Sequence, residues 1–185
     1  RLAHPADLKL AQAAIGGAPV QSAGTGYLRP LGAMRDLVPD RWFGLEAADT
    51  VILHDFPHSA LRPEQIAALR GYVAGGGTLM VPGGANWQRL AQSPLEKLWP
   101  LQPVSSSPAS STQVAAIVQK YLAGRAGLSG ADRLGGAPVL LVRGSLRSDA
   151  RVLLESGDTP LIAMRDLGAG RVLMTAFDAT QPPFV

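Results

Sequence analysis

The chain contains no cysteine among its 185 residues. This absence excludes disulfide bonds, zinc sites built from thiolates, and any reaction in which a cysteine thiolate attacks the substrate. It does not assign a compartment, because cysteine-free chains occur both in the cytoplasm and outside it. A catalytic function would therefore need a different nucleophile.

Long apolar runs and basic runs are also missing. No apolar stretch approaches the roughly 20 residues that a membrane-spanning helix requires. The net charge of +3 comes from scattered arginines, and no aromatic residues alternate with basic ones. We therefore expect no nucleic-acid partner. The chain starts at Arg1 and ends at Val185 without a leader or a closing motif, so we expect a single domain, residues 1–185, cut from a longer protein. Any membrane contact is then expected only through the missing flanking segments.

A strand–helix–strand pattern dominates the part that is present. Thr50–His54 is an apolar run typical of a strand buried on both faces. Pro63 suits the first turn of a helix, and apolar residues then recur at helical spacing up to the glycines at 75–77. Thr78–Val81 is a second buried strand. One such unit predicts a parallel sheet in an α/β protein.

The rest of the chain predicts two more helices and four strands joined as hairpins. The helices are expected at Trp87–Ala91 and Gln113–Leu122, and the strands at Val139–Val142, Val152–Glu155, Leu161–Arg165 and Val172–Phe177. Leu95–Val104 is interpreted as a loop interrupted by prolines, and Ser105–Ser111 as an exposed, flexible loop.

Two stretches, Ala48–Gly84 and Ala150–Asp178, carry a family resemblance. The letters LRPEQIAALRGYVAGGGTLMVPGG and ARVLLESGDTPLIAMRDLGAGRVLMTAFD resemble the class I glutamine amidotransferase-like domains. The similarity is to the non-catalytic, cysteine-less type in bacterial membrane-anchored proteins, related to trehalose-utilisation-like domains. It implies a three-layer flavodoxin or amidotransferase-like sandwich, with a mostly parallel central sheet and antiparallel C-terminal strands. It also implies an extracytoplasmic position.

The turn after the second predicted strand is the first candidate site. A nucleophile elbow would place serine or cysteine there, but the residues are Gly83, Gly84, Ala85 and Asn86. One interpretation is a cradle in which Gly83, Gly84 and Asn86 bind an anion through backbone N–H groups. The favoured interpretation is a close-packed turn that needs glycine.

His54, Asp55 and His58 form the one tight cluster of titratable residues, just past the carboxyl end of a predicted strand. Open α/β sheets bind ligands at that edge. A metal site is disfavoured, because adjacent residues in an extended chain point to opposite sides. We expect Asp55 to cap the following loop and the histidines to be partly exposed.

A Ser-His-Asp arrangement is conceivable from Ser59 or Ser145 with His54 and Asp178, although no elbow supports it. Asp178 ends the last predicted strand and is favoured as a residue that satisfies turn N–H groups.

The three tryptophans are expected mainly in the core. Trp42, with Phe43 and Leu45, and Trp99 are predicted to be anchors among apolar neighbours. Trp87 follows the glycine turn, so the rim of a sugar or peptide cleft is the alternative to core packing.

Together these features favour a non-catalytic interaction or ligand-sensing domain of a larger bacterial, envelope-associated protein. The expected partner is another protein, and no cofactor, metal or catalytic residue is expected. The weak ligand-binding candidates are Asp55, His58, Gly83, Gly84, Asn86 and Asp178. The alternative is a small-molecule or carbohydrate-related hydrolase with a rim cleft near Asp55, His58 and Asp178. The sequence does not predict an oligomeric state.

Overall fold

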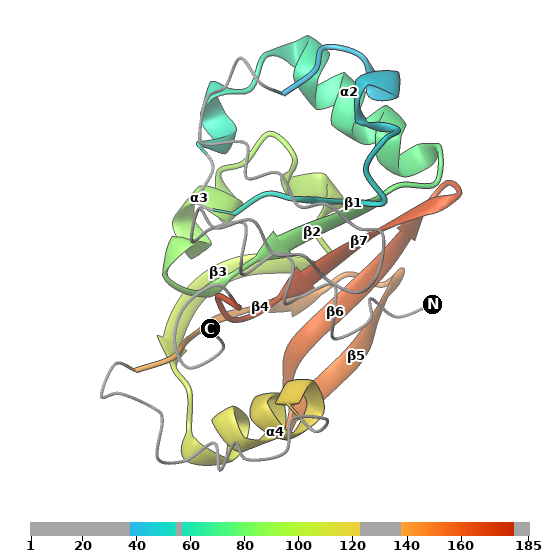
Figure 1. The fold of residues 1–185 in the computed structure, drawn as a ribbon. Helices are drawn as coiled ribbons and strands as arrows, with labels where there is room; N and C mark the ends of the chain where they lie inside the picture. Colours follow the sequence, from blue (N-terminus) through green and yellow to red (C-terminus); the bar gives the residue numbers. More distant parts are fainter. Residues whose placement is uncertain (1–37, 55–56, 123–137, 180–185) are drawn as a thin grey trace, which may run out of the picture.

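The computed structural model of the chain describes residues 38–54, 57–122 and 138–179. These residues form a mixed α/β fold with one five-stranded sheet and one two-stranded ribbon (Figure 1). The strands are β1 (Thr50–Ile52), β2 (Thr78–Pro82), β3 (Leu101–Pro108), β4 (Leu140–Leu146), β5 (Ala150–Ser156), β6 (Thr159–Leu167) and β7 (Gly170–Thr175). The helices are α2 (Pro63–Ala74), α3 (Trp87–Ala91) and α4 (Ser111–Leu122). Four short 3-10 turns complete the set: η2 (Trp42–Leu45), η3 (His58–Ala60), η4 (Gly84–Asn86) and η5 (Glu96–Leu98).

The five-stranded sheet has the order β1-β2-β7-β6-β5. β1 pairs with β2 and β2 with β7 in parallel, whereas β7–β6 and β6–β5 are antiparallel. The expected parallel pairing of the first two strands and the antiparallel pairing among β5, β6 and β7 are both present. The strand expected at Val139–Val142 does not extend this sheet, because β4 pairs with β3 in the separate ribbon. The parallel part is limited to three neighbouring strands, so their carboxyl ends meet at one edge of the sheet.

Helix α2 shows why this sequence makes a βαβ unit. The backbone N–H of Arg62 donates to the Gln65 side chain (3.0 Å), and Pro63 occupies the first turn. The helix ends at Gly75, and Gly76 follows with φ 122°, a conformation that glycine adopts without strain. Leu69 and Val73 are buried beneath the helix, which packs on β2 and β7.

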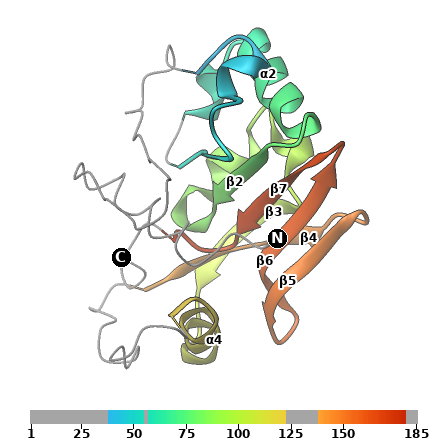
Figure 2. The same ribbon diagram turned by 45° about the vertical axis from the view of Figure 1, so that its right-hand side comes forward.

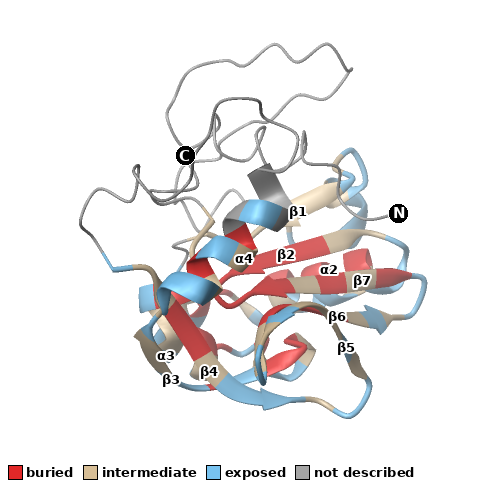
Figure 3. Cartoon of the chain, turned by 90° about the horizontal axis from the view of Figure 1, so that it is seen from below, coloured by how far each residue is buried: buried red, intermediate tan, exposed pale blue. Residues whose placement is uncertain are grey.

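The buried side chains form two clusters. The larger one joins α2, β2 and β7 to the α3–β3 connection around Trp99, and the smaller one joins α4, β4 and β6 around Ile117 and Phe177. Seen from the direction of Figure 3, buried residues run along β2 and β7, while the outer side of α4 is exposed. Figure 2 shows α2 and α4 at opposite ends of the molecule.

One stretch contradicts the sequence prediction. Leu101–Pro108 is strand β3, paired antiparallel with β4, where we expected a loop through Val104 and a flexible segment from Ser105. The register shifts between Pro103 and Ser105. A proline cannot donate a ladder hydrogen bond, so a bulge in a two-stranded ribbon is one of the few places in a sheet that tolerates it.

A second error concerns η2. Trp42 and Phe43, expected in the core, are 46% and 61% exposed. Leu45 does pack against the larger cluster, and Trp99 is fully buried as predicted. The apolar neighbours of Trp42 in the sequence therefore gave a misleading signal.

Candidate functional site

The carboxyl edge of the three parallel strands gathers most of the residues predicted as site candidates. His54 follows β1, the Gly83–Gly84 turn follows β2, and Asp178 follows β7. In open sheets that contain parallel strands, this is the edge where ligands bind. The sequence placed these residues at strand ends, and the parallel pairing brings those ends together.

His54 and Asp178 are in direct contact across this edge. Nε2 of His54 lies 3.2 Å from Oδ2 of Asp178, within hydrogen-bond distance, with side chains 18% and 14% exposed. The carboxylate can accept the imidazole N–H and so fix the orientation of the ring. Both side chains make further interactions. The pair is thus the histidine–aspartate part of the arrangement considered from the sequence.

Of the two serines of that arrangement, Ser145 lies far from the pair. Leu140, at the start of β4, has its carbonyl oxygen 3.6 Å from the place of a Cβ on Gly84. Ser145 is five residues further along β4, about 16 Å away at the usual rise per residue. Ser59 lies in η3 with an exposed side chain. Ser145 is therefore not a nucleophile for this pair.

The Gly83–Gly84 turn is packed against the chain that follows β7. The Gly83 N–H donates to the Phe177 carbonyl (3.3 Å), and the Gly84 N–H donates to the Ala176 carbonyl (3.1 Å). A Cβ on Gly83 would lie 2.6 Å from the Thr175 carbonyl oxygen. Gly84 has φ 88°, and a Cβ there would be 3.1 Å from that of Asp178. Both N–H groups therefore already bond to backbone, as a close-packed turn requires.

The residues after this turn are half-buried. Asn86 ends η4, and its side chain does not cap α3. Trp87 packs against the larger core cluster and keeps part of its surface exposed. Asn86 and Trp87 therefore border the carboxyl edge from the α3 side.

His58 lies in the core rather than at the rim. It is 2% exposed, and its ring centroid is 5.7 Å from that of Trp99. Burial, and then the positive charge of Arg89, lowers the pKa of His58 to about 4. The expectation of partly exposed histidines was wrong for His58, because the loop folds back over the indole. Asp55, the third member of the predicted cluster, lies outside the described residues.

Within the described ranges, no group of three or more histidine, aspartate or glutamate side chains is placed to hold a metal ion. No helix in the same ranges is both long and apolar enough to cross a membrane. The sequence analysis grouped Asp178 with His54 in the Ser-His-Asp arrangement and with His58 in the alternative hydrolase, and the structure brings Asp178 into contact with His54. The position of His54, two residues after the end of β1, was the signal that could have decided between them.

The fold and this edge define a class: an α/β domain with a His–Asp pair where three parallel strands end. Residues 45–185 match the family described as "Domain of unknown function (DUF7408)". The chain belongs to this family. No curated protein matches it.

Solved structures show the same general fold. The chain is similar to the cytoplasmic protein STM3548 from Salmonella typhimurium, with a TM-score of 0.55 and 15% identity over 81% of this chain and 68% of that one. It is also similar to the cytoplasmic protein STM1381 from Salmonella typhimurium LT2, with a TM-score of 0.53 and 16% identity over 79% of this chain and 66% of that one. This chain thus spans about two thirds of each structure. At these identities the likeness concerns the fold alone.

Proposed function

We propose that this chain is a non-catalytic binding domain of the amidotransferase-like type, part of a larger bacterial, envelope-associated protein whose partner is another protein. The finer architecture we propose for it is the three-layer flavodoxin-like sandwich. The sequence resemblance at Ala48–Gly84 and Ala150–Asp178 supports the type. The partner's contact region would be the carboxyl edge with His54, Asn86 and Asp178.

The packing at Gly83 is the observation that carries this proposal. An elbow nucleophile after β2 would need a side chain at this turn, and a Cβ on Gly83 would meet the Thr175 carbonyl oxygen at 2.6 Å and Val142 Cγ2 at 2.8 Å. The approach to the Thr175 carbonyl, a backbone atom, excludes serine and threonine there without a shift of β7. The chain also has no cysteine. The turn is therefore built for packing, and the edge is left with a histidine–aspartate pair and no elbow.

Two assays on one pair of variants test the proposal. The purified chain would be incubated with glutamine and with p-nitrophenyl acetate, beside Asp178→Asn and a matched control, Asp149→Asn, whose carboxylate pairs with Arg165 on the β5–β6 hairpin. We expect equal background rates for all three proteins. We also expect cross-linking of the full-length protein in its membrane to capture a protein partner, with a yield reduced by Asp178→Asn and unchanged by Asp149→Asn. Turnover that Asp178→Asn abolishes would overturn the non-catalytic function.

The His54–Asp178 contact favours a second candidate, a small-molecule or carbohydrate-related hydrolase. An oriented histidine can act as a general base for a serine hydroxyl or for water. Ser59 is the serine to test, because it follows the same strand as His54 and is exposed. A fluorophosphonate probe would label Ser59 in an active hydrolase, and Ser59→Ala would remove the label. Absence of labelling in the wild-type protein excludes this serine mechanism.

A further inference from the structure

Two adjacent aromatic side chains stand out on the surface of the described residues. Trp42 is 46% exposed and Phe43 is 61% exposed, both in η2. Their ring centroids are 6.2 Å apart and their planes meet at 73°. We call these two residues the aromatic corner. Neither the carboxyl-edge site nor the packing of the core uses their exposed surface.

The indole of Trp42 is supported from below by helix α2. A Cβ on Gly71 would lie 3.1 Å from Trp42 Cβ, and one on Gly75 would lie 3.9 Å from Trp42 Cζ3. The ring therefore follows the helix surface from Gly71 to Gly75, one helical turn apart. Glycine costs about 1 kcal/mol relative to alanine inside a helix, and here Gly71 leaves the space that the indole occupies. The result is a fixed aromatic surface with part of its area open to solvent.

The neighbourhood of the corner is polar and carries both signs of charge. Asp40 and Arg62 form an exposed ion pair, with side chains 52% and 40% accessible. Arg41 and Glu46 flank the aromatic residues and are exposed. An anionic lipid surface would be favoured by a cluster of positive charge alone, which mixed charges do not provide. Groups that donate and accept hydrogen bonds therefore surround a small apolar centre.

The area of the corner decides against a protein interface. Two aromatic side chains of this size, about half exposed, offer roughly 250 Å² at most. A specific protein–protein interface buries about 800 Å² per partner. The corner is thus large enough for one ring-shaped small molecule and too small to carry an interface alone.

We propose that the aromatic corner is a saccharide-binding site, in which the C–H face of a pyranose ring stacks on Trp42 with its edge against Phe43. The hydroxyl groups at the ring's rim pair with the surrounding charged side chains, among them Arg41 and Glu46. A sugar has this pattern, one apolar face bordered by donors and acceptors, whereas a purely apolar ligand would leave the polar rim unused.

This site is separate from the carboxyl edge. Gly75 and Gly76 lead into the beginning of β2, so the Trp42 end of α2 lies toward the amino ends of the parallel strands. His54, Gly83 and Asp178 lie at the opposite, carboxyl ends. The inference therefore goes beyond the proposed function, and its failure would leave the carboxyl-edge proposal unaffected.

Isothermal titration with three hexasaccharides, cellohexaose, chitohexaose and maltohexaose, tests the site. We expect at least one to bind the wild-type chain with a dissociation constant in the millimolar range or tighter. Trp42→Ala should weaken that binding at least tenfold, and Phe43→Ala should weaken it severalfold. Val104→Ala is the matched control, because Val104 is 64% exposed on β3 and lies outside the corner. It should bind like the wild type.

Three results would overturn the inference. The first is the absence of heat and of any thermal shift for all three sugars at 10 mM. The second is binding that Trp42→Ala and Phe43→Ala, both folded by circular dichroism, leave unchanged. The third is a concentration-dependent dimer, seen by light scattering in the wild type and lost in Trp42→Ala, which would assign the corner to a contact between copies. If Trp42→Ala does not fold, Phe43→Ala alone decides, because Phe43 is the more exposed of the two.

Discussion

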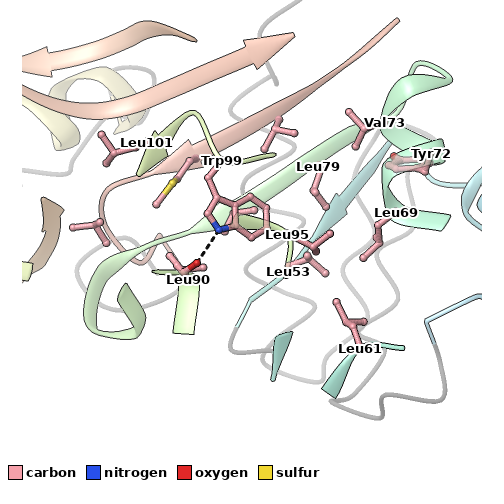
Figure 4. Close-up of a cluster of buried hydrophobic side chains, with 14 residues drawn as sticks. Leu53, Leu61, Leu69, Tyr72, Val73, Leu79, Leu90, Leu95, Trp99 and Leu101 are labelled. Atoms are coloured by element: carbon pink, nitrogen blue, oxygen red, sulfur yellow. Dashed lines mark hydrogen bonds between the residues drawn. The ribbon is translucent and has the colours of Figure 1, made fainter. Parts of the chain in front are cut away.

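Trp99 and Trp42 have similar surroundings in the sequence and different surroundings in the structure. Each is followed by leucine within three positions. Trp99 is fully buried, and its indole N–H donates to the Leu90 carbonyl (3.0 Å; Figure 4). Leu95 and Leu101 belong to the same buried cluster. Trp42 instead lies on the outside of α2 with nearly half its surface exposed.

The difference shows what determines whether a tryptophan of this chain is buried or exposed. A buried indole needs an acceptor for its N–H as well as apolar neighbours, since an unpaired buried donor costs about 1–3 kcal/mol. The Leu90 carbonyl in α3 accepts the hydrogen bond from the Trp99 indole, whereas Trp42 lies on the surface of α2 beside Gly71 and Gly75. Neither contact can be predicted from the residues next to each tryptophan in the sequence.

The largest expected effect is that of Trp99→Ala. Removing a fully buried tryptophan should lower the free energy of unfolding by about 3–5 kcal/mol, which is a large part of the stability of a domain of this size. Urea unfolding followed by circular dichroism measures it. Trp99→Phe keeps one aromatic ring and loses the N–H and the second ring of the indole, so it should cost less than Trp99→Ala. A loss below about 1 kcal/mol for Trp99→Ala would show that the cluster repacks around the space.

The next effect is a pH dependence that originates at His58, the ring beside Trp99. Its pKa of about 4 in the folded state lies below the 6.5 of an exposed histidine. The unfolded chain therefore binds the proton first, so the stabilising contribution is complete above pH 6.5 and is lost between about pH 6.5 and 4. We expect a loss of about 2–3 kcal/mol between pH 7.5 and 4.5 from this group, from 1.36 kcal/mol per pKa unit.

His58→Leu isolates that contribution, because it introduces an apolar side chain of similar size that does not titrate. Urea midpoints at pH 7.5 and pH 4.5 should differ less in this variant than in the wild type. Equal pH dependence of the two proteins would show that the charged form of His58 is accommodated in the core.

The smallest effect is expected for Trp42→Ala. Trp42 is already 46% exposed, and its buried part includes the contact with α2 at Gly71 and Gly75. The free energy of unfolding should fall by about 2 kcal/mol or less, because roughly 100 Å² of apolar area is lost and each Å² removed from water contributes about 25 cal/mol at most. A thermal melt beside that of Trp99→Ala gives the comparison directly. A loss of about 3 kcal/mol or more, in the range expected for Trp99→Ala, would make Trp42 a structural anchor, as the sequence suggested.

Much of the main sheet could be predicted from the sequence. The continuous apolar runs, the proline at the start of α2 and the glycines at its end all report local backbone requirements, and the helix Trp87–Ala91 was predicted with its observed bounds. Strand β3 was missed because its prolines and serines are typical of loops. Its pairing with β4 depends on residues more than thirty positions away, which a local pattern does not contain.

The sequence predicted where the residues of the candidate site lie along the strands, but it did not predict which of them are in contact. Strand ends located His54, Gly83, Gly84 and Asp178, because carboxyl ends of parallel strands share an edge. The choice between His54 and His58 depended on how η3 folds over Trp99, which is a tertiary contact. The engagement of both glycine N–H groups likewise depended on the chain after β7.

The place of β7 has a consequence for how the protein is made. β7 is the last described strand in the sequence, yet it lies in the middle of the sheet, between β2 and β6. The carbonyl of Ala176 just beyond it accepts hydrogen bonds from both Gly84 and Val142, which joins the β2 turn and the β3–β4 ribbon to the same point. On the ribosome, the βαβ unit from β1 to β2 and the β5–β6 hairpin therefore emerge before the strand that pairs with both of them in the sheet. The sheet can close only after Phe177 has left the exit tunnel, and until then β2 and β6 each present an open edge to other chains.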